Sequence, residues 1–357
     1  MWGVAACFGL TLATGCGDGK APATGPGGTS AAASADKPRI LFITNSNADF
    51  WSAVEKGMKD GGAEFGCQVE MRRNNEKTQG QVEKLKEAIG LSDVAGVAVS
   101  AIEADAPGVI DAMRELQQAG KVVITIDSDV ATSAADARSA YIGTNNGKAG
   151  QTAGRAAAAL RPDGGKVAVF VGTSSAANAR EREAGFFEGA GSKFVRVETF
   201  EDGGDHSKAG SNVQSAISKI PDVGVLLGLW SYNAPAIAGE VRKSPEVRKS
   251  ASVVTFDLDE AAVTDLSDGM IDASVVQNPY DMGYQGVRAL KALIKKDAKA
   301  TKEVLTGADG KTRETGVRVV VPKADSPVLK LNKPKGDDVI TVDEMKTWLS
   351  SKGLKSS

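Results

Sequence analysis

Two carboxylates stand at the end of the apolar run VVITI (122–126), where the chain reads Asp127, Ser128, Asp129. A run of this composition predicts a strand that is covered on both faces. An Asx-turn or a cap explains an aspartate at such a place, because its side chain accepts from nearby backbone N–H groups. Contact with a ligand or a cation is the other explanation. We expect it for Asp127, leave Asp129 open between the two, and include both in the candidate site.

Polar and aromatic side chains follow the other predicted strands in the same way. They are Asn45, Asn47, Phe50 and Trp51 after 39–44; Ser100 and Glu103 after 96–100; Arg180 and Arg182 after 166–171; Trp230, Tyr232 and Asn233 after 223–229; Asp257 after 252–256; and Gln277 at the end of 272–277. Carboxylates accept hydrogen bonds, guanidinium groups donate them and amides do both, which suits the hydroxyls of a sugar. The C–H face of a sugar packs on an aromatic ring, as apolar ligand surface does in most pockets. These residue types favour a small hydroxylated ligand.

In two of these groups, two candidate residues lie close together in the sequence and need not both face the ligand. Phe50 and Trp51 begin a predicted helix, and we expect one of them in the core and at least one at the ligand. Arg180 and Arg182 are two positions apart on a predicted helix, so only one of them faces the site. We select Arg182.

Structural roles compete with ligand contact at two further positions. Asn233 and Asp257 each precede a predicted helix, where Asn and Asp are favoured N-cap residues. Gln277 precedes Pro279, where the chain is expected to cross between two lobes. We expect all three at the ligand, together with Ser100 and Trp230.

Strands and helices alternate along the chain from Lys37 onward. The predicted strands are 39–44, 67–71, 96–100, 122–126, 166–171, 194–200, 223–229, 252–256 and 272–277. They are rich in Val and Ile, and repeated βα units of this kind predict doubly wound parallel sheets that bind ligands at the carboxyl ends of their strands. About ten units exceed one sheet of average size. We therefore expect an α/β protein with two lobes, divided near 139–147.

Charge and single motifs argue against several other classes of protein. The net charge of −2 and the interspersed signs argue against nucleic acid as a partner. The segment GTNNGKAG (143–150) is one residue short of a phosphate-binding loop, and Ala149 replaces the required Ser or Thr. His206, the single histidine, is expected in a surface turn, and Cys67 as a structural thiol. We expect no cofactor, no metal site and no catalytic residue.

The N-terminal segment predicts export. Residues 1–16 are small and apolar and read as a signal peptide, and ATGC before Gly17 resembles a lipobox with Cys16 as the lipidated residue. No Lys or Arg precedes the apolar run, and Ala13 stands where Leu is usual, so plain secretion is the alternative. Residues 17–37 have almost no side chains to bury and predict a flexible tether.

Four segments combine these features: ILFITNSNADFW (40–51), VVITIDSD (122–129), GTSSAANAREREAGF (172–186) and VVTFDLDEAAVTDLSDGMIDASVVQNPYDMGYQGV (253–287). In them the chain resembles the bacterial periplasmic sugar-binding proteins of the ribose-binding type. The resemblance implies the type I periplasmic binding protein fold, with two Rossmann-like, doubly wound parallel-sheet lobes joined by a three-segment hinge. It implies an N-terminal lobe of 38–143 with 279–305 and a C-terminal lobe of 144–278 with 306–357.

The resemblance also implies roles for single residues. Phe50 and Trp51 would sandwich the sugar, Asp127 would bind its hydroxyls, and Arg182, Asn233, Asp257 and Gln277 would make the remaining polar contacts.

The chain departs from the ribose binders at several of their contact positions. Ser128 stands where they have Arg, and Ser100 and Ala48 stand where they have Asn. Gly204 replaces an aromatic residue of the second lobe, for which we expect Trp230 to compensate. We therefore expect this chain to share the fold of the ribose binders but not to share ribose as the ligand.

The sequence therefore predicts the solute-binding component of an ABC importer, which binds a monosaccharide or similar polyol between its lobes and closes at a hinge. We expect a monomer that is not an enzyme and that lies in the periplasm or at the cell surface. Its expected partner is a transporter permease, and its expected contact with the membrane is a lipid on Cys16 alone. A binding protein that reports to a receptor kinase and a sugar-modifying enzyme are the alternatives. The acids near the cleft leave an amino sugar or other cation open. The tail VITVDEMKTWLSSKGL (339–354) predicts a helix without an assigned role.

Overall fold

Two sheets carry the fold, and a computed structural model describes residues 37–74, 77–331 and 338–357. Both sheets lie in one compact unit. The predicted signal peptide (1–16), Cys16 and nearly all of the predicted tether (17–37) lie outside the described residues. None of the helices in the described ranges combines the length and the hydrophobicity needed to cross a bilayer.

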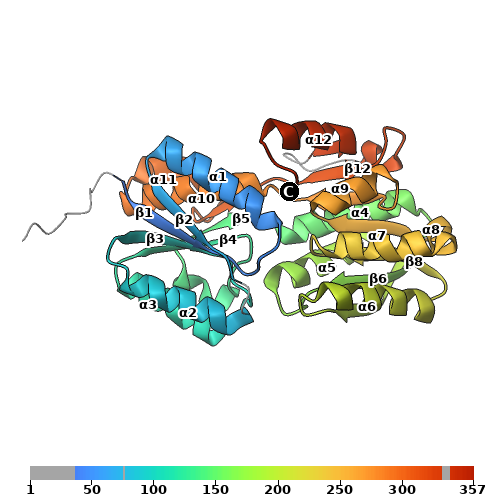
Figure 1. The fold of residues 1–357 in the computed structure, drawn as a ribbon, viewed down its shortest axis with the longest axis horizontal. Helices are drawn as coiled ribbons and strands as arrows, with labels where there is room; N and C mark the ends of the chain where they lie inside the picture. Colours follow the sequence, from blue (N-terminus) through green and yellow to red (C-terminus); the bar gives the residue numbers. More distant parts are fainter. Residues whose placement is uncertain (1–36, 75–76, 332–337) are drawn as a thin grey trace, which may run out of the picture. The chain divides into compact units, whose positions relative to one another are not determined.

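The first sheet has six parallel strands. Their order is β11 (Thr312–Glu314), β5 (Ala140–Gly143), β4 (Val122–Ile126), β3 (Val94–Val99), β1 (Arg39–Ile43) and β2 (Gln68–Arg72). The helices beside it are α1 (Phe50–Phe65), α2 (Lys77–Gly90), α3 (Pro107–Gln118), α10 (Pro279–Ile294) and α11 (Ala298–Val304), with the 3₁₀ turn η1 (Thr132–Ala137). Figure 1 shows α1 and α10 on one side of the sheet and α2 and α3 on the other. We call this sheet and its helices the N-lobe.

The second sheet has seven strands. Their order is β13 (Asp338–Thr341), β12 (Arg318–Val321), β10 (Ala273–Val276), β9 (Ser252–Phe256), β8 (Val223–Gly228), β6 (Gly165–Val171) and β7 (Phe194–Glu201). All neighbours are parallel except β10 and β12. The helices are α4 (Asn146–Leu160), α5 (Ala177–Ala190), α6 (His206–Lys219), α7 (Asn233–Lys243), α8 (Pro245–Ser250), α9 (Glu260–Ser267) and α12 (Val342–Ser351), with the 3₁₀ turn η2 (Pro327–Lys330). We call this sheet and its helices the C-lobe.

Burial on both faces explains why the apolar runs of this sequence form strands. In β1, Ile40 and Phe42 lie in a core shared with α1 and α10, while Leu41 and Ile43 lie in a second core shared with α2 and α3. Successive side chains of a strand point to opposite faces, so a continuous apolar run fills both cores at once. The C-lobe repeats this arrangement in β6.

The chain passes between the lobes three times. It leaves the N-lobe after β5 and enters α4, returns from β10 to α10, and leaves again between β11 and β12. The structure thus confirms the predicted α/β class with two doubly wound lobes and three connecting segments. Ser100, Asp127, Asp257 and Gln277 directly follow the carboxyl ends of β3, β4, β9 and β10, whereas Trp230 follows β8 after one residue and Arg182 lies within α5.

Four of the short strands were not predicted from the sequence. All nine predicted strands overlap observed ones, but β5, β11, β12 and β13 were not predicted. The tail predicted as one helix begins instead with β13, and the helix starts at Val342. The lobe boundaries stay a prediction, with one difference: β11 pairs with β5 of the N-lobe, although 306–357 was expected in the C-lobe.

Candidate functional site

Asp127 and Asp257 occupy equivalent places in the two lobes. Each directly follows a strand, β4 or β9, and their φ angles are 62° and 60°. This left-handed backbone is uncommon outside glycine, although Asp is among the residues that tolerate it. Their carbonyls accept hydrogen bonds from the Tyr141 hydroxyl at 2.9 Å and the Ser274 hydroxyl at 2.8 Å, respectively. In each lobe, a hydroxyl from the strand next to β4 or β9 therefore holds the aspartate in this strained backbone conformation.

Asp127 is an almost fully buried carboxylate. Its side chain accepts from the Ser100 hydroxyl at 3.0 Å and lies 3.5 Å from the Asn45 amide nitrogen. Burial raises the pKa of Asp127 to about 6, and the charge of Arg182 acts in the opposite direction. Asp257 raises the same pKa further by like charge, so the two acids influence each other across the lobes.

Arg182 is an almost fully buried cation in the middle of α5. Its Nε donates to Asn146 Oδ1 at 3.0 Å, and its Nη1 donates to Leu229 O at 2.8 Å. The helices α4 and α5 touch at this point, since a Cβ on Gly150 would lie 2.3 Å from Arg182 O. This close crossing brings Arg182 beside Asn146. Its third nitrogen, Nη2, is buried and has no hydrogen-bond partner in the described ranges.

Asp257 and Gln277 form a second buried pair within the C-lobe. The Gln277 backbone N–H donates to Asp257 Oδ1 at 3.0 Å, and its side-chain amide donates to Asp257 Oδ2 at 2.9 Å. Arg182 Nη1 lies 3.9 Å from Asp257 Oδ2. Burial raises the pKa of Asp257, and the Arg182 charge opposes this. The amide oxygen of Gln277 is buried and unpartnered among the residues that the structure describes.

The structure therefore brings five predicted residues into one group, which we call the central cluster. Its members are Ser100, Asp127, Arg182, Asp257 and Gln277, and all are buried. Among the residues that the structure describes, one donor of the cluster, Arg182 Nη2, and one acceptor, Gln277 Oε1, have no partner. Buried polar atoms rarely lack partners in folded proteins. A hydroxyl both donates and accepts, so it can satisfy atoms of either kind.

A hydrogen-bonded chain beside the central cluster joins the two lobes. The Trp230 indole N–H donates to Asn178 Oδ1 at 3.3 Å, and Asn178 Nδ2 donates to Ser128 Oγ at 3.0 Å. Ser128 follows Asp127 directly, and its backbone N–H donates to Ser100 Oγ at 3.3 Å. The sequence prediction missed Asn178 as a site residue and treated Ser128 only as a departure. Only their contact in space reveals the connection.

Asn233 supports Trp230 from within the C-lobe. Its side-chain oxygen accepts from the Trp230 backbone N–H at 3.0 Å, and its amide donates to Asp202 Oδ2 at 3.1 Å. Tyr232 also donates to Asp202, whose pKa is raised by burial and lowered by these two hydrogen bonds. The side chain of Asn233 is fully buried and its polar atoms are used. Asp202 has no signal in the sequence.

The predicted site residues Phe50, Trp51 and Asp129 make their contacts within the N-lobe and not with the central cluster. Phe50 and Trp51 pack edge to face at 5.3 Å within the N-lobe core, and the Trp51 indole donates to Ser46 Oγ at 3.1 Å. Asp129 is held by two hydrogen bonds from Arg138, at 2.6 and 2.5 Å, and by one from Thr125 at 2.6 Å. Its carboxylate serves the N-lobe itself, mainly through the Arg138 ion pair rather than through the Asx-turn or cap expected as the alternative, and the Val130 N–H adds one backbone bond at 2.9 Å.

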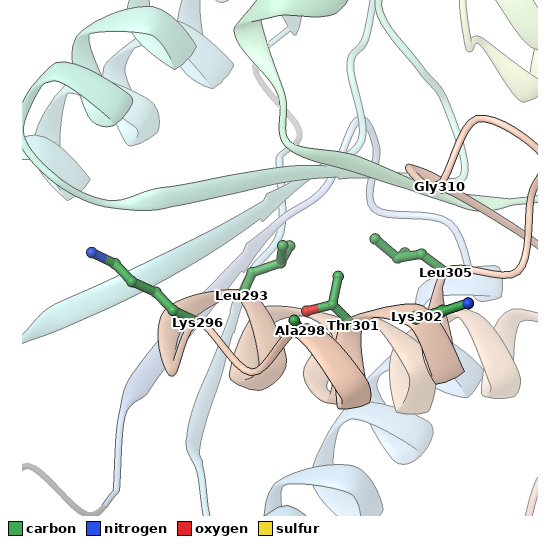
Figure 2. Close-up of a pocket in the computed structure, with 7 residues that line it drawn as sticks. All are labelled: Leu293, Lys296, Ala298, Thr301, Lys302, Leu305 and Gly310. Atoms are coloured by element: carbon green, nitrogen blue, oxygen red, sulfur yellow. The ribbon is translucent and has the colours of Figure 1, made fainter.

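There are two surface hollows of about 450 Å³ each, one at α10 and α11 of the N-lobe and one where the segment between β5 and α4 lies beside α5 of the C-lobe. The first is lined by Leu293, Lys296, Ala298, Thr301, Lys302, Leu305 and Gly310. Figure 2 shows its two lysines extending in opposite directions rather than toward one another. The second includes Tyr141, Thr144, Glu181 and Glu314. No member of the central cluster lines either hollow. In the described ranges, no three His, Cys, Asp or Glu side chains gather as metal ligands.

Curated relatives of the chain are sugar-binding proteins by name. The D-ribose/D-allose-binding protein of Pseudomonas aeruginosa is 26% identical over 265 residues, which are 72% of this chain and 83% of the relative. The ribose import binding protein of Bacillus subtilis is 22% identical over 246 residues, which are 68% of this chain and 77% of the relative.

Solved structures of high similarity carry the same fold. An ABC transporter solute binding protein from Burkholderia graminis, in complex with D-arabinose, matches with a TM-score of 0.72 and 27% identity over 84% of this chain and 99% of its own. A glucose-galactose binding protein from Geobacillus stearothermophilus matches with a TM-score of 0.72 and 24% identity over 81% and 99%. The predicted type I periplasmic binding protein fold is thus confirmed. The family model of the periplasmic binding protein domain matches residues 40–298. The chain belongs to the periplasmic binding protein family.

Proposed function

We propose that the protein is the solute-binding component of an ABC importer and that it binds a monosaccharide or a similar polyol at the central cluster. One observation carries the choice of site: Arg182 Nη2 and Gln277 Oε1 are buried without partners in the described ranges. Leaving a buried polar atom unsatisfied costs about 1–3 kcal/mol. Ligand hydroxyls that pair with these two atoms would recover this cost. The names of the relatives support a sugar as the ligand, since they bind ribose, allose or arabinose.

The proposed contacts come from both lobes. Asp127 from the N-lobe accepts ligand hydroxyls, with Ser100 fixing its carboxylate. Arg182, Asp257 and Gln277 from the C-lobe supply the opposite side of the site. Trp230 and Phe50 are the proposed aromatic contacts, whereas Asn233, Trp51 and Asp129 support the site through their observed bonds. A ligand that bonds both sides favours the form in which the lobes meet, by its differential affinity for that form.

The charges of the central cluster extend the proposed ligand class from neutral sugars to amino sugars. The central cluster holds two carboxylates, Asp127 and Asp257, against the single guanidinium of Arg182. An amino sugar would add a positive charge near the acids and lower their pKa values. A comparison of glucose with glucosamine therefore decides between the two ligand classes.

Several further properties belong to the same proposal. The protein acts by binding and release without catalysis, as a monomer whose two lobes present their rims to a permease. Its lobes are 38–143 with 279–305 and 144–278 with 306–357, apart from the N-lobe strand β11. It lies in the periplasm or at the cell surface, attached through a lipid on Cys16. Mass spectrometry of the mature N-terminal peptide tests the lipid.

A thermal-shift screen tests the function. Pentoses, hexoses, amino sugars and polyols are added singly to the mature protein, and a true ligand at 100 times its dissociation constant stabilises it by about 2.7 kcal/mol. Asp127→Ala is expected to remove the shift. Asp222→Ala is the matched control, because Asp222 is an exposed aspartate of the C-lobe that pairs with Lys166. A screen without any stabilising sugar, or an Asp127→Ala protein that binds like the parent, would reject the proposal.

A further inference from the structure

The last residues of the described chain end in a buried backbone pairing. Beyond α12, the chain returns so that Leu258 N–H donates to Ser357 O at 2.7 Å, and Ser357 N–H donates to Leu258 O at 2.8 Å. Ser357 is 1% exposed. Ser356 and Ser357 carry no apolar side chains, so their burial brings little hydrophobic stabilisation. Its two backbone hydrogen bonds therefore dominate this contact.

The partner of this pairing is part of the candidate site. Leu258 follows Asp257, whose φ is 60°. The Ser357 hydroxyl also donates to Gln277 O at 3.4 Å. The same short segment thus contacts the backbone next to one central-cluster residue and the backbone of another.

The N-lobe fixes its own aspartate differently. There the residue after Asp127 is Ser128, and its backbone N–H is taken by Ser100 Oγ at 3.3 Å. Ser100 ends a strand of the same sheet, so the N-lobe needs no outside segment. At the equivalent place of the C-lobe, the N–H of Leu258 is taken by Ser357. The segment therefore does for the backbone N–H after Asp257 what Ser100 does for the backbone N–H after Asp127.

The other end of the segment reaches the N-lobe. Lys352 Nζ lies 4.7 Å from the centroid of the Tyr280 ring on α10. The Tyr280 hydroxyl donates to Asp60 Oδ2 at 2.9 Å, and Asp60 belongs to α1. Between these ends, Leu354 packs against the C-lobe core. Residues 352–357 consequently contact both lobes, and we call them the C-terminal strap.

We propose that the C-terminal strap positions Asp257 and Gln277 for the ligand and couples them to the N-lobe through Lys352. The assignment rests on the proposed function for its ligand, but its contacts are independent of which sugar binds. The strap gives a role to the tail that the sequence left unassigned. Ser357 and Lys352 are positioning residues, because neither belongs to the central cluster.

Hydrogen–deuterium exchange combined with sugar binding tests the first half of the proposal. A chain that stops at Lys355 lacks the pairing with Leu258 but keeps α12 and Lys352. We expect faster exchange of the Leu258 amide, little change in melting temperature, and an affinity about tenfold weaker for whichever of D-ribose, D-allose and D-arabinose the parent binds. Tenfold corresponds to about 1.4 kcal/mol. Unchanged exchange, or faster exchange with unchanged affinity, would overturn the positioning role.

A matched pair of lysine variants tests the second half. Lys352→Ala removes the contact with Tyr280, whereas Lys355→Ala removes only an exposed pair with Glu260 at 3.4 Å. Small-angle scattering of the sugar-free proteins is expected to show a larger radius of gyration for Lys352→Ala and the parent value for Lys355→Ala. Equal values for both variants would overturn the coupling. If the parent binds none of the three sugars, the proposed ligand class fails. The contacts of the strap are then supported by faster Leu258 exchange in the shortened chain together with a larger radius for Lys352→Ala, and rejected if either is unchanged.

Discussion

Replacing Arg182 by Met is the sharpest perturbation of the central cluster. Met keeps an unbranched apolar side chain over the Phe256 ring, which lies 4.6 Å from the guanidinium carbon. It removes the hydrogen bonds to Asn146 and Leu229 and the positive charge beside Asp127 and Asp257. The two buried acids then face each other without their cation.

The expected losses follow from these contacts. Breaking a buried charge pair by removing one partner costs about 3–5 kcal/mol. We expect the free energy of unfolding to fall by about 3 kcal/mol at pH 8. The pKa values of Asp127 and Asp257 rise without Arg182, so the loss is smaller at pH 5, where the acids take up protons. A charged hydrogen bond is worth about 1.5–3 kcal/mol, which predicts sugar binding weakened by about tenfold to a hundredfold through loss of the Nη2 contact.

Urea unfolding followed by tryptophan fluorescence, at pH 5 and pH 8, measures the stability, and calorimetric titration measures the affinity. Arg180→Met is the matched control, because Arg180 is an exposed arginine of the same helix whose Nη1 donates to Ser175 O. Our reasoning is refuted if Arg182→Met loses less than about 0.5 kcal/mol, a surface-like effect. It is also refuted if the two variants weaken sugar binding equally.

Three further predictions concern the surroundings of the cluster. Gly172→Ala should displace Trp230, because the added Cβ would lie 2.1 Å from a ring carbon; unaltered indole fluorescence and affinity would contradict this. The folded pKa of Asp127, about 6, exceeds its unfolded value of about 3.9, so the native state binds the extra proton and the contribution of Asp127 to stability falls as pH rises from about 4 to 6. Asp127→Asn should flatten this fall in urea titrations at pH 4.5 and 7, and an unchanged slope would argue against a buried acid. Ser128→Ala and Asn178→Ala should be non-additive in a double-mutant cycle of sugar affinity by about 1 kcal/mol, whereas strict additivity would show that their hydrogen bond does not contribute.

Periodicity and strand-end chemistry made most of the fold and the centre of the site predictable. A run such as VVITI has apolar residues for both faces of a sheet, so its burial follows from composition. The strand-end positions of Asp127, Asp257 and Gln277 were predictable because parallel strands bring their carboxyl ends to one edge of each sheet, while their contact with a ligand stays a prediction. Four of the short strands gave no such signal. AYIG (140–143) is four residues long and becomes a strand through its neighbours β4 and β11.

Partnerships between distant residues were not predictable. Asp127 and Asp129 are the same residue type after the same strand. Nevertheless, the Asp129 carboxylate pairs with Arg138, whereas the Asp127 carboxylate belongs to the central cluster. Nothing in the sequence near Asp129 identifies Arg138 as its partner. Asn178 and Asp202 lacked any pattern, because their importance lies in contacts with Ser128 and Asn233 that only the folded chain creates.

A crystal structure of the protein with the sugar found in the screen tests the central claim most directly. Our account predicts a sugar oxygen within about 3 Å of Arg182 Nη2 and another within about 3 Å of Gln277 Oε1, the usual hydrogen-bond distance. A well-ordered sugar bound elsewhere, for example in the hollow beside Leu293, with both atoms still unpartnered, would contradict it.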